Sequence, residues 1–228
     1  MKLNTKEKSK VISCCNEKLI SDYNFDSAQE YPAEWFRRQF SFIDNEKLRE
    51  HLGDEFYQTR FTFTLMETLS LPMSKNKGII KFQIIQYASI CEAILNYTLE
   101  MFFKDEFENR YAATQFSNIE AALSSKTKIT YEGKPVFICK PKMEKAKITW
   151  TSNPTKAEFA VEKGILTEET KGKYCALYDL RNNAHILKAA TADYYPKPKE
   201  AKAAYELLFQ FLGEVRAFYA ASQRQDEA

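Results

Sequence analysis

The residues best suited to chemistry stand in one short run, Arg181-Asn182-Asn183-Ala184-His185. In a helix, residues four positions apart share a face, so Arg181 and His185 would project side by side with Asn182 on an adjoining face. An imidazole can carry a proton near neutral pH, and a guanidinium can hold a phosphate or stabilise negative charge that develops on it. This pair suffices for metal-independent RNA cleavage, in which the neighbouring 2′-hydroxyl attacks the phosphodiester and leaves a cyclic phosphate.

Spacing alone is a weak signal, because an arginine and a histidine four positions apart often have a structural or surface role. Other catalytic signatures are absent from the sequence: it has no phosphate-binding glycine-rich loop, no His-Glu-x-x-His and no Gly-x-Ser-x-Gly. The chain contains only two histidines and five cysteines, with no Cys-x-x-Cys spacing. We therefore predict free thiols, no metal site and no cofactor.

Composition indicates a folded, largely helical protein. Hydrophobic residues make up 44% of the chain and aromatic residues 14%, enough to form a core, while only six glycines and seven prolines disfavour an all-β fold with many turns. The formal net charge is +2, so any nucleic-acid site must be local. The start is polar and lysine-rich, and no apolar run approaches the roughly 18 residues of a membrane span. We expect a cytoplasmic protein without membrane contact.

Apolar residues at helical spacing predict a series of helices, the longest of which should be central to the fold. Gly53 is expected to end one helix, with His51 in its last turn in a structural or surface role, and Asp54 to cap the next. Thr167 is the expected N-cap of the helix that carries the Arg181 motif. The expected helices cover residues 5–23, 45–52, 55–70, 79–103, 105–123, 154–163, from 168 through the motif, and 199–222.

Between Ser124 and Asn153 the pattern changes to that of a small β structure. Residues 128–131 and 135–138 flank Glu132-Gly133-Lys134 as in a hairpin, and residues 146–151 again suggest an extended segment. Its lysines, near aromatic side chains, can bind a phosphate backbone and stack a base. We favour the alternative of a solvated hairpin whose lysines protect its edge.

The surroundings of the motif resemble the second half of a HEPN domain. Residues 159–169 are similar to a short helix that ends in a Gly-Leu-like turn, and residues 178–185 contain a Leu-Arg-Asn…His signature. The family's earlier long helix, with its small residue and Glu, is similar to residues 88–95. We therefore predict a mainly α fold, with a HEPN-like helical bundle over residues 76–228, a small β-hairpin insertion at about 125–153, and an N-terminal helical extension over 1–75.

The resemblance implies a homodimer in which two Arg…His motifs face each other across a cleft and form one composite ribonuclease site. Arg181 would bind the scissile phosphate, His185 would act as general acid or base, and Asn182 would orient the pair.

The residues around the motif complete the expected site. Asn183, Lys188 and Tyr178 are the candidate substrate contacts. Glu92 is expected either to anchor Arg181 from the central helix or to remain a solvated side chain.

Three functions remain open. The first is an endoribonuclease that cleaves single-stranded RNA, as a defence or toxin effector. In the family four to six residues usually separate the Arg and the His, whereas three separate them here. Because of this departure from the nuclease signature, a second hypothesis stands beside the first. The chain would then be a non-catalytic dimerisation or interaction module within a defence or toxin–antitoxin complex, with an antitoxin or another defence subunit as partner. The third is a helical adaptor in which the motif is accidental.

Overall fold

The computed structural model describes residues 3–23, 32–72, 75–118, 129–137, 139–183 and 195–226. Within these residues the protein is mainly helical, with eight α-helices and two small two-stranded antiparallel sheets. The chain forms two compact units, one of Met1–Leu95 with Asn153–Ala228 and one of Asn96–Ser152. The first is called the helical unit below, and the second the β unit.

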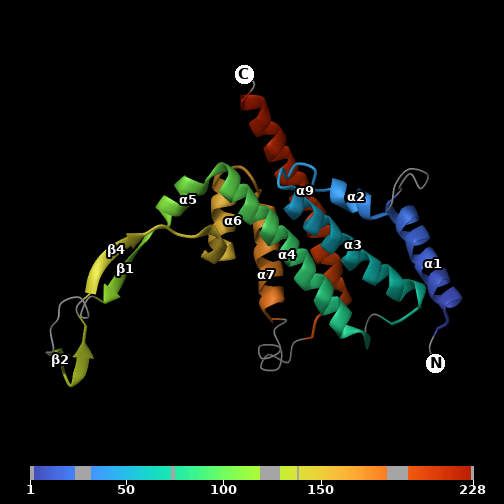
Figure 1. Cartoon of the computed structure of the whole chain (residues 1–228), viewed down its shortest axis with the longest axis horizontal. Coiled ribbons are helices and arrows are strands. Elements are labelled where there is room, and N and C mark those ends of the chain that lie inside the picture. The colour runs from blue at the N-terminus through green and yellow to red at the C-terminus, as the bar shows by residue number, and fades with distance from the viewer. Residues whose placement is uncertain are drawn as a thin grey trace. The chain divides into compact units, whose positions relative to one another are not determined.

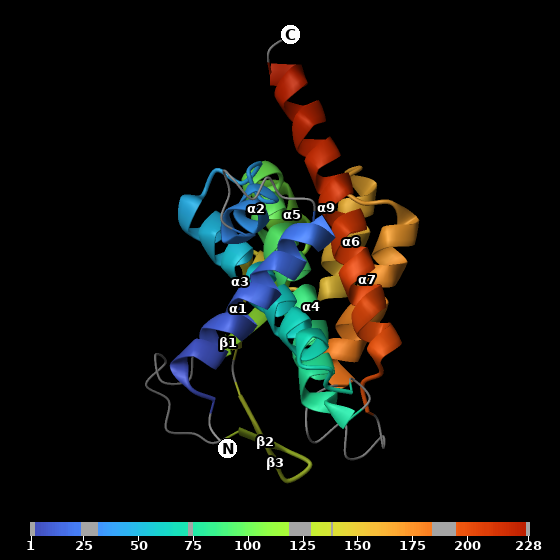
Figure 2. The ribbon, with the colours of Figure 1, turned by 90° about the vertical axis from the view of Figure 1, so that its right-hand side faces the viewer.

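The helical unit is organised around its longest apolar helix, α4 (Figure 1). The predicted apolar stripe of α4 is buried at Ile80, Ile84, Ala88, Cys91 and Leu95. Figure 2 shows α7 and α9 side by side, and these helices contact each other. The helices of this unit are α1 (Thr5–Tyr23), α2 (Pro32–Arg38), α3 (Glu46–Thr68), α4 (Lys77–Phe102, which continues into the β unit), α6 (Asn153–Glu162), α7 (Glu168–Asn183) and α9 (Pro198–Asp226).

Contacts between aromatic rings pack the N-terminal helices α2 and α3 against the rest of the helical unit. Phe56 of α3 is fully buried. Its ring centroid lies 4.8 Å from that of Phe36 in α2, 6.3 Å from Tyr87 in α4 and 5.7 Å from Phe209 in α9. Aromatic contacts of this kind add to the free energy of burial, so α2 and α3 share a core with α4 and α9.

The predicted break between two helices at Gly53 is wrong. Helix α3 runs without interruption from Glu46 to Thr68, and Asn45 caps it by accepting a 3.0 Å hydrogen bond from Leu48 N. A Cβ at Gly53 would lie 2.6 Å from Arg37 Cα, so the glycine permits close packing of α2 on α3. Asp54 accepts hydrogen bonds from the Arg37 guanidinium at 3.0 and 2.9 Å. His51 is consequently an exposed residue inside a long helix, not at its end.

The β unit starts earlier than predicted. The helix expected over 105–123 ends after α5 (Lys104–Arg110), and β1 (Ala113–Asn118) pairs antiparallel with β4 (Cys139–Glu144), with Phe116 opposite Pro141. The local apolar pattern suggested a helix, but a partner strand distant in sequence satisfies the backbone of β1.

The expected hairpin of the β unit is present as β2 (Ile129–Tyr131) and β3 (Lys134–Val136). Glu132 and Gly133 form its turn with φ of 51° and 74°, as a two-residue hairpin loop requires. The extended segment predicted at 146–151 is wrong, because a 3₁₀ turn, η3 (Ile148–Trp150), occupies it.

Among the described residues, α4 is the single helix long and apolar enough to cross a membrane, with a mean hydropathy of 1.3 in its most apolar window. Half of that window is buried inside the protein.

Candidate functional site

Arg181 lies on α7, and the position of this helix is set by contacts at its first turn. Thr170 N donates a 3.2 Å hydrogen bond to Thr167 Oγ1, so the predicted N-cap at Thr167 is confirmed. The turn before it is also as predicted, because Gly164 follows α6 with a φ of 69°. Local sequence signals therefore fix where α7 begins.

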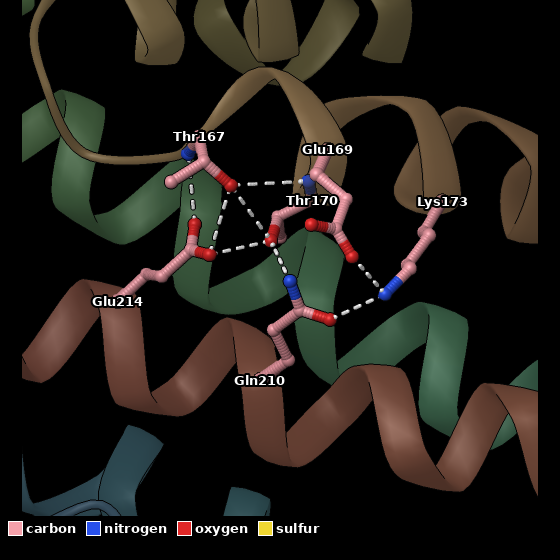
Figure 3. Close-up of polar contacts among 6 residues, drawn as sticks. All are labelled: Thr167, Glu169, Thr170, Lys173, Gln210 and Glu214. Carbon is pink, nitrogen blue, oxygen red and sulfur yellow. Dashed lines mark hydrogen bonds and ion pairs between the residues drawn. The ribbon is translucent and has the colours of Figure 1, made fainter.

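A polar network joins this first turn to α9 (Figure 3). Glu214 accepts hydrogen bonds from Thr167 N at 2.8 Å and from Thr170 Oγ1 at 2.6 Å. Gln210 Nε2 donates to Thr170 Oγ1 at 2.7 Å. Thr170 is fully buried, so the two bonds to its hydroxyl are partly shielded from solvent, whereas the bond from Thr167 N is exposed. Together these bonds fix the rotation of α7 about its own axis.

Salt bridges join the same region of α7 to α6. Lys171 Nζ lies 2.7 Å from Glu158 Oε2 in α6 and 2.6 Å from Glu168 Oε2 in its own first turn. Hydrogen bonds to Glu158 and Glu168 raise the pKa of Lys171. Exposed pairs of this kind contribute little stability, but they align the two helices.

Near the last turns of α7, three helices bring charged side chains together. Arg181 Nη1 lies 3.3 Å from Glu92 Oε2 of α4, and Lys156 Nζ of α6 lies 3.8 Å from Glu92 Oε1. The side chains of Arg181 and Glu92 are 29% and 22% exposed, whereas that of Lys156 is 1% exposed. One partly exposed carboxylate therefore pairs with two cations, of which Lys156 is buried and Arg181 is partly exposed.

The three charges of this cluster are coupled. Burial lowers the pKa of Lys156, the Glu92 carboxylate opposes that shift, and Arg181 adds to it. Burial thus dominates the behaviour of Lys156, and Glu92 stabilises its charged form.

Two tyrosines of α7 border the cluster. The Arg181 guanidinium carbon lies 5.3 Å from the centre of the Tyr178 ring, within the range of a cation–π contact. The Tyr174 hydroxyl is buried and has no hydrogen-bond partner in the described part of the chain. Burial raises the pKa of Tyr174, and the neighbouring Cys91 and Glu92 raise it further. Tyr174 is therefore a neutral phenol beside the acidic member of the cluster.

The structure brings together three of the site residues predicted from sequence: Arg181, Tyr178 and Glu92. At the end of α7, Asn182 is half-buried and Asn183 is exposed, and the cluster formed by the described residues does not include them. His185 and Lys188 lie outside the described residues.

Lys156 is the member of the cluster that the sequence analysis missed. It precedes Phe159 and Ala160 by three and four positions in α6, and both of these residues are fully buried. Helical spacing places all three on one face, so a lysine on an apolar face was the available signal.

The described residues contain no group of three or more His, Cys, Asp or Glu side chains that could hold a metal ion. All five cysteines are free thiols.

The comparisons with known proteins give no family for this arrangement. The chain matches no family model, no curated protein and no solved structure.

Proposed function

We propose that the chain is a metal-independent endoribonuclease of the HEPN type, a cytoplasmic defence or toxin effector that cleaves single-stranded RNA. The observation that supports this most is the ion pair between Arg181 of the Arg-Asn-x-x-His motif and Glu92 of the central helix. A HEPN-like site would need such a link between the motif helix and the long apolar helix.

The charge of the cluster suits a phosphate. Arg181 is the partly exposed cation of the cluster, and its charge attracts an anion that approaches from solvent. Arg181 is partly exposed and a guanidinium has five N–H donors, so one edge can pair with Glu92 while another binds a phosphate oxygen. Glu92 then acts as a positioning residue that limits the rotamers of Arg181.

The chemical step requires a base and an acid besides this arginine. A base removes the proton of the 2′-hydroxyl, and the resulting oxygen attacks the adjacent phosphorus. The bond to the 5′-oxygen breaks and an acid protonates the leaving group, giving a 2′,3′-cyclic phosphate and a 5′-hydroxyl. His185 is the candidate for proton transfer, and in a homodimer the two copies of His185 can serve as base and acid. Asn182 would orient the pair of Arg181 and His185.

Residues next to the motif would hold the RNA. Tyr178 presents a ring beside Arg181, and an unstacked base can stack on such a ring. Asn183 is exposed at the end of α7, where its amide can contact a base or a ribose. Lys188 would contribute a phosphate contact.

A second candidate function is a non-catalytic dimerisation or interaction module within a defence or toxin–antitoxin complex. The exposed apolar side chains of the β unit favour it. Phe116 is 70% exposed, Met143 67% and Trp150 79%. Exposed apolar side chains of this size on one small unit indicate a contact surface for a partner. In this case the pair of Glu92 and Arg181 would only lock helix packing.

Incubation of the purified chain with a pool of single-stranded RNAs in EDTA separates the two functions. We expect cleavage that leaves cyclic-phosphate or 3′-phosphate ends, that His185→Ala abolishes, and that His51→Ala preserves. His51 is the matched control because it is the other histidine of the chain and is exposed on α3. A folded dimer that leaves every RNA intact would favour the interaction module.

A further inference from the structure

The helical unit contains a pocket of about 450 Å³ that none of the cluster residues lines. Helices α3, α4 and the first turns of α9 form its walls, and its apolar lining includes Phe63, Tyr87 and Tyr205. This volume is within the range of pockets that bind small organic molecules.

Arg60 of α3 is the unusual member of this lining. Its guanidinium carbon lies 4.3 Å from the centre of the Tyr205 ring, 4.7 Å from that of Phe63 and 5.7 Å from that of Tyr23. Its Nε atom is buried and makes no hydrogen bond, and the described residues place no carboxylate within ion-pair distance of it. Aromatic rings around an arginine displace part of its hydration shell, and here no protein carboxylate compensates for that loss.

The neighbouring tyrosines do not supply the missing negative charge. Burial raises the pKa of Tyr87 to about 12, although the Arg60 guanidinium opposes this rise. Burial also raises the pKa of Tyr23, whose hydroxyl is hydrogen-bonded to that of Tyr205 at 2.8 Å. Both Tyr23 and Tyr87 are therefore neutral phenols near physiological pH.

The rest of the lining adds positive charge. Lys199 and Lys202 are exposed on the first turns of α9 and line the same pocket. One acid, Glu206, also lines it and lies 3.7 Å from Lys202. Three basic side chains and one acidic side chain thus surround a mainly apolar space.

We propose that this pocket binds a small organic anion, with a carboxylate or phosphate group bound by Arg60 and an aromatic or aliphatic body packed against Phe63, Tyr87 and Tyr205. The bound anion would accept a charge-assisted hydrogen bond from Arg60, whose Nε has no partner in the described residues. The two lysines would attract the ligand from solvent, so that its affinity falls as the salt concentration rises.

Calorimetric titration of the full chain with three probes tests this site: naphthoate, naphthyl phosphate and the neutral alcohol naphthalenemethanol. We expect at least one of the two anions to bind at least about tenfold more tightly than the alcohol, as a hydrogen bond to a charged group implies. Comparison of the two anions identifies the preferred head group. Equal affinity for the alcohol and both anions, or no binding of either anion, would overturn the proposal.

Arg60→Gln should remove this preference for the anion, while Arg224→Gln should keep it. Arg224 is the matched control because it is an exposed arginine at the opposite end of α9, bonded to the backbone of its own helix. If Arg60→Gln does not fold, the exposed pair Lys199→Gln and Lys202→Gln should weaken anion binding and reduce its salt dependence. Anion affinity that survives these changes would contradict the site.

Discussion

Arg181 Nη1 lies 3.3 Å from Glu92 Oε2, and this contact joins the end of the motif helix α7 to the central helix α4. Lys156 reaches the other oxygen of the same carboxylate from α6, at 3.8 Å. Removal of Glu92 would therefore leave two neighbouring cations without their shared partner.

Replacement of Lys156 by Met should change how stability depends on pH. Because burial lowers the pKa of Lys156 in the folded protein, the unfolded chain binds more protons at pH values between the folded and unfolded pKa. The free energy of unfolding contributed by this group therefore rises as pH increases through that window, which ends near the unfolded value of about 10.4.

Urea unfolding at a series of pH values measures this effect as the difference between the wild type and Lys156→Met. We expect the variant to lose the increase in the free energy of unfolding that Lys156 contributes as pH rises, and to keep the pH dependence that comes from other groups. Lys47→Met is the control, since Lys47 is exposed on α3 and should give a curve parallel to that of the wild type. A Lys156→Met curve that is also parallel to the wild type would show that this lysine titrates as it does in water.

Two glycines should respond to alanine in opposite directions. A Cβ at Gly53 would lie 2.6 Å from Arg37 Cα, so Gly53→Ala must separate α2 from α3, at a cost of about 1–3 kcal/mol. Gly213 lies inside α9 and a Cβ there meets nothing within 4 Å. Gly213→Ala should stabilise the protein by roughly 0.5–1 kcal/mol. Denaturant unfolding measures both, and a stabilising Gly53→Ala would contradict the close packing of α2 on α3.

Thr170→Val should lower the free energy of unfolding, because it weakens the packing of α7 against α9. The change preserves the shape of a fully buried side chain but removes the hydroxyl that bonds to Glu214 and Gln210. We expect a loss of about 1–3 kcal/mol, because the groups left without partners are partly buried.

Thr62→Val is the matched control for this change. The Thr62 hydroxyl bonds to Gln58 O of its own helix, at 2.8 Å, so the loss should stay within about 0.5 kcal/mol. Equal losses for the two variants, measured by thermal or urea unfolding, would show that the network in Figure 3 does not hold α7.

Local signals in the sequence were sufficient where local interactions decide the structure. The N-cap at Thr167 and the turn at Gly164 occur as predicted. The apolar stripe predicted for α4 is buried except at its last member, Phe102, which is 39% exposed. The prediction failed at Gly53, where packing against another helix gives the glycine its role. It also failed at Ala113–Asn118, which a strand distant in sequence draws into a sheet. The partners in these two cases, α2 and β4, cannot be identified from the hydrophobic pattern of the segment itself.

The candidate site shows the same division. Its arginine and glutamate were identified through a resemblance in short motifs, and the structure places Arg181 and Glu92 in contact. Lys156 was missed because a charged residue on a helix is normally assigned to a solvated face. Its burial depends on how α6 packs against its neighbours, which helical periodicity does not specify.

The most direct test is a double-mutant cycle on the rate of RNA cleavage in EDTA, with Glu92→Gln, Arg181→Gln and the double variant. Arg181→Gln should lower the rate by about 10²-fold or more, as loss of a group that stabilises developing charge does. Glu92→Gln should lower it less, and the double variant should be no slower than Arg181→Gln, because Glu92 acts through Arg181. Independent, multiplicative effects of the two changes, or an unchanged rate in Arg181→Gln, would contradict the account.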